Sequence, residues 1–238
     1  MTVPSPQRQQ GRRWPSSGRQ KLPWHQRRWH RGPVSLIGLM AIALLMVLAL
    51  PQPGVAQLFN SAVDQLPAQE RAALRSGQVT VAGGNGSYTG RVLANAPVNT
   101  AWDVLTDYGN FARFFPSVTS SRLLESEGNR RVFEQVNEVR VFPVTRRSRI
   151  VISATESYPQ QIAFRLIEGD VNSLQGVWRL DPVAPYAGAA PNQVLITHQV
   201  TVDPGSSATR GLFLNIYENT LAETLTALKQ ETERRARR

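Results

Sequence analysis

The chain has no cysteine and only three histidines in 238 residues. The lack of cysteine excludes disulfides, thiol nucleophiles and cysteine-based metal sites. Any folded domain therefore depends on an ordinary hydrophobic core, which about 150 residues are enough to build. His25 and His30 lie in a basic N-terminal segment, so the rest of the chain holds only His198. No catalytic set of the Ser-His-Asp kind and no metal site is indicated, and no cofactor is expected.

Acidic residues are also missing from the first 33 positions, which carry eight arginines and lysines. This segment supplies most of the formal net charge of +10. The remaining residues hold 19 basic and 17 acidic side chains and are therefore nearly neutral. A nearly neutral domain lacks the basic surface that binds a phosphate backbone, so no nucleic-acid partner is predicted. We interpret residues 1–33 as a basic, disordered leader.

An uncharged apolar run follows the leader at residues 34–50 and reads VSLIGLMAIALLMVLAL. As a helix it is roughly 25 Å long, which is short for a membrane span and slightly long for the core of a signal peptide. Pro51 and Pro53 end the helix, and small residues precede a possible cleavage site after Ala56. Residues 34–56 are thus predicted to be a signal peptide or an N-terminal membrane anchor. In either case the following domain is expected to be exported, because a basic flank stays in the cytoplasm.

Residues 57–85 are predicted to form a helical lead-in and a linker. Pro67 suits the start of a helix, Gly77 suits its end, and the glycines at 83, 84 and 86 indicate a turn. A strand is expected at residues 87–96. Two short helices should follow it, since apolar positions after Pro97 recur with helical spacing and a second short helical piece is expected from Asn110 to Pro116.

The next hundred residues contain β-branched and aromatic segments separated by turn signals, which predicts six further strands. They are expected at residues 121–127, 131–141, 144–156, 161–168, 174–180 and 194–202. A long amphipathic helix is expected at residues 206–235, with an inner stripe that begins at Leu212 and Phe213 and ends at Leu228. The fold class is therefore α+β: a curved antiparallel sheet of about seven strands around a long C-terminal helix. Such an arrangement leaves room for a ligand cavity between sheet and helix.

These residues carry a resemblance to a known family. Residues 91–98 (RVLANAPV) and 101–108 (AWDVLTDY), followed by NF at 110 and FFP at 114, resemble the opening of START-like proteins. Within that superfamily the chain is most similar to the coenzyme Q-binding and polyketide cyclase/dehydrase branch. Residues 173–180 (SLQGVWRL) and the terminal helix continue the pattern. The resemblance implies a helix-grip domain at residues 86–236, on a scaffold that hosts lipid carriers, hormone receptors, cyclases and ring-hydroxylase subunits.

Five aromatic side chains are the candidate ligand-binding residues of such a domain. The resemblance places Phe114 and Phe115 near the mouth of the cavity, Trp178 on the sheet, and Phe213 and Tyr217 on the terminal helix. They could line a site for an isoprenoid, a quinone or an acyl chain, or they could simply fill the core, since aromatics do so in most folds. Trp102 is expected to belong to the core.

The other polar candidates have simpler interpretations. His198 lies in the middle of a predicted strand and is expected to be a hydrogen-bonded structural histidine rather than a general base. Glu134, Glu138 and Arg140 alternate along a strand and are expected on its solvated face. The arginines at 146, 147 and 149 are expected to form a solvated turn.

The sequence therefore predicts a binding protein rather than an enzyme. Its partner would be a hydrophobic small molecule, a quinone or lipid, held at the outer face of the cytoplasmic membrane. The membrane itself would be a second partner, through residues 34–50, if the segment is not cleaved. Two alternatives stay open: a cyclase/dehydrase acting in the same cavity, and an accessory module with a filled core that binds another protein.

Overall fold

The computed structural model describes residues 61–141, 144–186, 188–205 and 210–238, without the side chains at 139–141, 144 and 146. The predicted leader and the signal or anchor segment, residues 1–56, lie outside the described residues. The helices are α2 (Ala68–Arg75), α3 (Val98–Leu105), the short 3-10 helix η1 (Phe111–Arg113) and α4 (Arg210–Ala236). The strands are β1 (Thr80–Gly84), β2 (Ser87–Ala94), β3 (Val118–Glu127), β4 (Arg130–Val141), β5 (Val144–Ser157), β6 (Gln161–Gly169), β7 (Ser173–Val183) and β8 (Gln193–Asp203).

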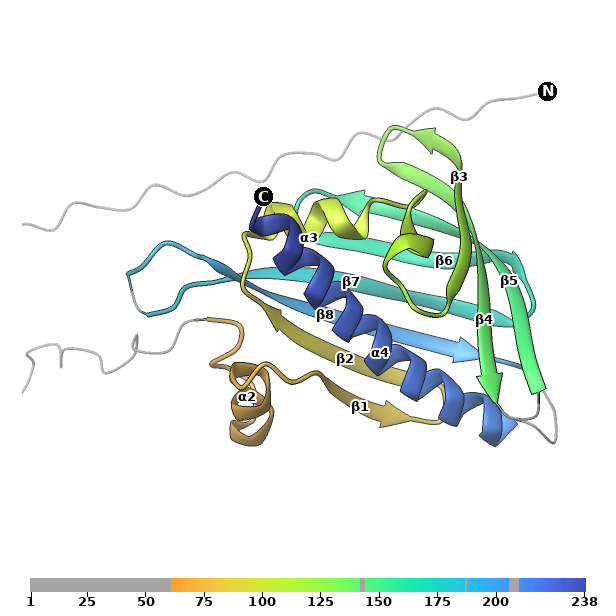
Figure 1. Ribbon diagram of the computed structural model, residues 1–238, viewed down its shortest axis with the longest axis horizontal. Helices are drawn as coiled ribbons and strands as arrows, with labels where there is room; N and C mark the ends of the chain where they lie inside the picture. The colour runs from red at the N-terminus through yellow and green to blue at the C-terminus, as the bar shows by residue number, and fades with distance from the viewer. Residues whose placement is uncertain (1–60, 142–143, 187, 206–209) are drawn as a thin grey trace, which may run out of the picture. The chain divides into compact units, whose positions relative to one another are not determined.

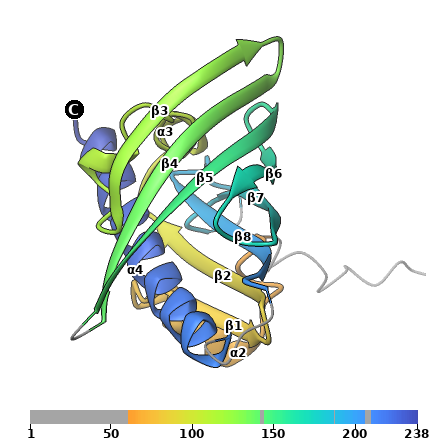
Figure 2. The same ribbon diagram turned by 90° about the vertical axis from the view of Figure 1, so that its right-hand side faces the viewer.

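The described strands form one antiparallel sheet in the order β1-β2-β8-β7-β6-β5-β4-β3. Each pair of neighbours is antiparallel, and only β2 and β8 join segments far apart in the sequence. Figure 1 shows α4 crossing the face of this sheet, and Figure 2 shows the sheet curving around the helix. The predicted helix-grip architecture is confirmed.

The sheet has one strand more than the predicted seven. Residues 80–84 were expected to lie in a linker, whereas they form β1 and pair with β2 from Gly84–Ser87 to Thr80–Arg91. The two strands are joined by Asn85 and Gly86, whose φ angles are 55° and 95°. Two positive φ angles in a two-residue loop define a type I′ turn, which folds a following strand back on its neighbour. The hairpin extends the edge of the sheet beside α4.

The two faces of the sheet carry separate apolar clusters because successive side chains of a strand point to opposite faces. Val92 and Ile196 belong to the large cluster under α4, whereas the adjacent residues Leu93 and Leu195 belong to a second cluster. We call this second group the back-face cluster; it consists of Val63, Leu74, Leu93, Val183 and Leu195, all buried. The lead-in segment with α2 thus covers the back of the sheet, opposite α4.

The helix α4 approaches the sheet closely over Gly90 of β2. A Cβ atom at Gly90 would lie 2.4 Å from Cδ1 of Leu225, which is fully buried. The glycine therefore allows the helix to pack directly on the strand. Of the predicted inner stripe of α4, Leu221 and Leu228 are buried, but Leu212 is 55% exposed. Leu212 lies in the first turn of the helix, and its assignment to the inner stripe was wrong.

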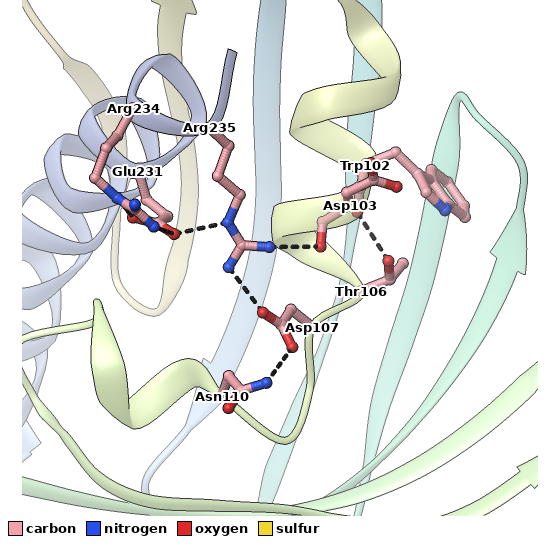
Figure 3. Close-up of polar contacts among 8 residues, drawn as sticks. All are labelled: Trp102, Asp103, Thr106, Asp107, Asn110, Glu231, Arg234 and Arg235. Atoms are coloured by element: carbon pink, nitrogen blue, oxygen red, sulfur yellow. Dashed lines mark hydrogen bonds and ion pairs between the residues drawn. The ribbon is translucent and has the colours of Figure 1, made fainter. Parts of the chain in front are cut away.

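A charged network ties the C-terminal end of α4 to α3 and η1 (Figure 3). Arg235 donates from Nε to Glu231 (2.6 Å) and from Nη2 to Asp107 (2.7 Å). Glu231 also accepts two hydrogen bonds from Arg234, at 2.6 and 2.5 Å. Asp107 in turn accepts a hydrogen bond of 2.6 Å from the amide of Asn110. These contacts fix the corner between α3 and η1 against the end of the helix.

Within the described part of the chain, none of the helices has the length and apolar character needed to span a membrane.

Candidate functional site

A cavity of about 260 Å³ lies between the concave face of the sheet and α4. This volume is slightly below the usual range of about 300–1,000 Å³ for small-molecule sites. Its walls are mainly apolar and come from three parts of the fold. The sheet contributes Phe133, Gln135, Asn137, Ser148, Ile150, Ile152, Ala154, Ile162, Phe164, Leu174, Trp178, His198 and Val202. The second part consists of Leu105 at the end of α3, the corner residues Tyr108, Phe111, Phe115 and Ser117, Val118 at the start of β3, and Val171 of the β6–β7 loop. The helix contributes Phe213, Ile216, Tyr217, Thr220, Leu221 and Thr224.

Four of the five aromatic residues predicted from the sequence meet at this cavity. Phe115 comes from the corner, Trp178 from β7, and Phe213 and Tyr217 from α4. Phe213 and Tyr217 stack on each other with ring centroids 6.1 Å apart, because a spacing of four residues places them on one face of the helix. Trp102 belongs to the core cluster, as expected, and packs edge-on against Tyr158.

The fifth, Phe114, does not line the cavity. It lies in a surface depression beside Arg113, Arg234 and Arg235, and the guanidinium of Arg235 lies 5.5 Å from its ring centroid. Phe114 directly follows the 3-10 helix η1, and its ring contacts that of Phe115 edge-on with centroids 4.7 Å apart. The two rings are in contact, but only that of Phe115 lines the cavity. Phe114 therefore supports the charged network on the outside, while Phe115 supports the cavity.

The surroundings of His198 in the cavity wall differ from those predicted. It is buried, with only 5% of its surface exposed, and its ring lies between those of Trp178 and Phe164. The centroid distances are 3.7 Å to Trp178 and 5.4 Å to Phe164. Nδ1 of His198 has no hydrogen-bond partner among the described residues. The expected hydrogen-bonded structural histidine is thus not what this part of the fold shows.

Strand register explains the position of His198. It pairs with Trp178 on β7 and with Gly90 on β2. Phe164 reaches it from one strand further away, because its partner on β7 is Gly176. A Cβ atom at Gly176 would lie 2.6 Å from the Phe164 ring, so only glycine leaves room for the ring to extend across β7. Burial lowers the pKa of His198 to about 3, and the imidazole is therefore neutral at physiological pH.

A small polar group occupies the part of the cavity wall formed by β4 and β5. The side-chain amide of Gln135 donates a hydrogen bond of 2.8 Å to Asn137, and Asn137 pairs across the strands with Ser148. These residues were not predicted from the sequence. The signal was present in the alternation of β4, since Glu134 was assigned to the solvated face and its neighbours Phe133 and Gln135 must then point inward.

The corner after α3 is an aromatic cluster that closes one part of the cavity. Tyr108 stacks on Phe133 with centroids 4.6 Å apart, and Phe111 contacts Phe115 at 5.1 Å. The hydroxyl of Tyr108 donates a hydrogen bond of 3.0 Å to Glu156. Burial, together with the nearby charge of Glu156, raises the pKa of this tyrosine. Tyr108 therefore stays protonated and serves as a fixed wall of the cavity.

The charged residues of β4 and β5 belong to the other face. Glu134 accepts hydrogen bonds from Arg149 (2.7 Å) and Arg122 (3.2 Å), and Arg149 also pairs with Glu168 at 2.7 Å. Hydrogen bonding by Arg149 lowers the pKa of Glu134. The solvated face predicted for Glu134 is where the structure places it. The side chains of Arg140 and Arg146 lie outside the described residues. Over the described ranges, no group of three or more histidine or acidic residues is placed to hold a metal ion.

A curved antiparallel sheet that holds a mainly apolar cavity against one long helix defines a class of ligand-binding domains, the helix-grip folds. The sequence model of the family described as "Polyketide cyclase / dehydrase and lipid transport" matches residues 94–229, which is more than half of the chain. The chain belongs to this family, as the START-like resemblance predicted. No curated protein sequence matches the chain.

Solved structures show the same fold. A STAR-related lipid transfer protein from Xanthomonas axonopodis is 22% identical, with a TM-score of 0.50 over 65% of this chain and 92% of that chain. A START superfamily protein from Mycobacterium smegmatis is 14% identical, with a TM-score of 0.51 over 61% of this chain and 96% of that one. A protein from Thermus thermophilus is 16% identical, with a TM-score of 0.51 over 62% and 94%. At these identities the likeness concerns the fold alone.

Proposed function

We propose that this domain binds one hydrophobic small molecule, a quinone, an isoprenoid or a lipid, in the cavity between the sheet and α4. The observation that carries the proposal is the cavity itself, which has room for a ligand and is walled mainly by apolar and aromatic side chains. Removal of apolar ligand surface from water drives binding to such a site. The family description, which includes lipid transport, supports this proposal.

The proposal extends to the place of action. Residues 1–33 are basic and residues 34–50 are uncharged and apolar, a pattern typical of export or membrane anchoring. A domain delivered to the outer face of the cytoplasmic membrane would be close to membrane-soluble ligands. Cell fractionation followed by N-terminal sequencing of the recovered protein tests this. A mature N-terminus at Gln57 indicates cleavage, and a full-length chain in the membrane fraction indicates an anchor. A full-length chain in the cytoplasm would contradict both.

The ligand proposal is tested by extracting the purified protein with organic solvent and analysing the extract by mass spectrometry. Thr220→Phe places a larger side chain in the cavity, because Thr220 lines it. Thr226→Phe is the matched control on the same helix: Thr226 is exposed, and its hydroxyl bonds to the backbone oxygen of Ala222. We expect an apolar compound from the wild type and from Thr226→Phe, and much less from Thr220→Phe. Equal recovery from both variants would contradict binding in this cavity.

A second candidate is a cyclase or dehydrase that acts in the same cavity, as the family description allows. The observation that favours it is the presence of His198, a potential proton acceptor, in the cavity wall. Incubation with a linear poly-β-ketone thioester, followed by mass spectrometry, separates the two candidates: a cyclised product supports the enzyme, and unchanged substrate supports binding alone. The third alternative, an accessory module with a filled core, is disfavoured by the cavity.

A further inference from the structure

Two polar side chains from different walls line the cavity, and one of them has a buried atom without a hydrogen-bond partner among the described residues. His198 stands in the sheet wall, where its Nδ1 is buried and unpaired. Tyr217 stands in the helix wall; it is only half-buried, and its hydroxyl is not among the buried groups that lack a partner. A buried polar group that makes no hydrogen bond destabilises the folded protein. A ligand placed between the two walls would contact both side chains and would give the imidazole the hydrogen bond that it lacks.

The imidazole is held in a fixed orientation. The centroid of the His198 ring lies 3.7 Å from that of Trp178 and 5.4 Å from that of Phe164, with interplanar angles of 25° and 14°. Because Trp178 is also the cross-strand partner of His198, the stack is fixed by the register of β7 and β8. A neutral imidazole offers one hydrogen-bond donor and one acceptor. It can therefore meet either a hydroxyl or a carbonyl.

The rest of the lining limits the charge of the ligand. Among the described residues that line the cavity there is no aspartate, glutamate, lysine or arginine. Burial keeps His198 neutral and, with the nearby Tyr88, raises the pKa of Tyr217. A charged group would thus enter this cavity without a counter-ion, which is strongly unfavourable. A neutral polar group would not carry this penalty.

We propose that His198, assisted by Tyr217, is the hydrogen-bonding anchor for a single neutral polar group, a hydroxyl or a carbonyl, on an otherwise apolar ligand. The inference rests on the proposed function and narrows its ligand class. It selects prenol-like or quinone-like molecules over pure hydrocarbons and over lipids whose charged head group would lie inside the cavity.

The test uses two probes that share one carbon chain, farnesol and its hydrocarbon counterpart farnesene. Binding to the full-length protein is measured by displacement of the neutral dye N-phenyl-1-naphthylamine. We expect the wild type to prefer farnesol by about tenfold, the size of one or two net hydrogen bonds. His198→Phe keeps a stacked ring and removes both nitrogens, so it should lose the preference while farnesene binding is retained.

Tyr217→Phe removes one oxygen atom and is the variant least able to disturb folding. It should reduce the preference for farnesol several-fold, whereas Tyr158→Phe, a control at a tyrosine that is 66% exposed, should not change it. Circular dichroism checks that each variant is folded; if His198→Phe is not, Tyr217→Phe decides the test. A preference that survives in the folded variants overturns the anchor. Equal binding of both probes to the wild type also overturns it but leaves the proposed function intact. No binding of either probe overturns both.

Discussion

Replacement of Glu231 by glutamine tests whether the charged network at the end of α4 stabilises the fold. The side chain of Glu231 is only 9% exposed and is bound by Arg234 and Arg235. Hydrogen bonds from Arg234 and then from Arg235 lower its pKa from 4.5 to about 2, although burial alone would raise it. A carboxylate whose pKa is lowered by folding stabilises the folded state wherever it is ionised.

The sign and size of the effect follow from these two pKa values. Because the folded pKa lies below the unfolded one, the stabilisation is complete above about pH 5 and is lost as the pH falls toward 2. The difference between the folded and unfolded pKa corresponds to roughly 3 kcal/mol at pH 7 and to about half of that at pH 3. We therefore expect Glu231→Gln to lower the free energy of unfolding by up to about 3 kcal/mol at pH 7, and by about half of that at pH 3.

Urea denaturation followed by circular dichroism, repeated at several pH values, measures this difference. Comparing the variant with the wild type at each pH cancels the contribution of His198, which both proteins share. Glu223→Gln is the control, since Glu223 is exposed on the same helix, and it should change stability by less than about 0.5 kcal/mol at any pH. The reasoning is refuted if Glu231→Gln destabilises the protein equally at pH 7 and pH 3, or not at all.

Three further predictions concern packing and titration. Gly90→Val should lower the free energy of unfolding by about 1–3 kcal/mol, because its Cβ atom would lie 2.4 Å from a fully buried Leu225 side chain. Gly84→Val, which has open space around it, is the control in the same denaturation assay. An equal loss of stability in both variants would contradict the close approach of α4. Leu74→Ala should lower the free energy of unfolding by about 2–4 kcal/mol but leave farnesol binding unchanged, since the back-face cluster lies opposite the cavity. Weaker farnesol binding by the fully folded variant would contradict the separation of the two faces. Farnesol affinity should be constant between about pH 5.5 and 8, because burial holds the pKa of His198 at about 3; a dye-displacement titration with a midpoint near 6.5 would show an exposed imidazole instead.

The periodicity of the sequence was sufficient to predict the layered fold. The long helical stretch at the end of the chain and the alternating strands report local preferences that the tertiary structure keeps. Strand β1 was missed because two of its five residues are glycines, which carry no side chain to show an alternation. It forms because the Asn85–Gly86 turn directs the chain back along β2.

The arrangement of the residues in the cavity wall was harder to predict from the sequence. The different environments of Phe114 and Phe115 depend on the geometry of one turn, which composition does not reveal. The environment of His198 depends on the register between β7 and β8 and on the space that Gly176 leaves for Phe164. Whether aromatics enclose a cavity or fill a core depends on how closely α4 approaches the sheet, and that distance is a property of the assembled fold.

The stability of the folded domain also depends on whether the cavity holds a ligand. A ligand that occupies this mainly apolar cavity binds the folded chain and not the unfolded one, and it therefore stabilises the fold. A ligand at a concentration one hundred times its dissociation constant increases the free energy of unfolding by about 2.7 kcal/mol. This raises the melting temperature of a domain of this size by roughly 5–10 °C. Thermal shift against a library of neutral apolar compounds is therefore a direct way to find the ligand, and unfolding resistance inside cells becomes a measure of how much of it is present.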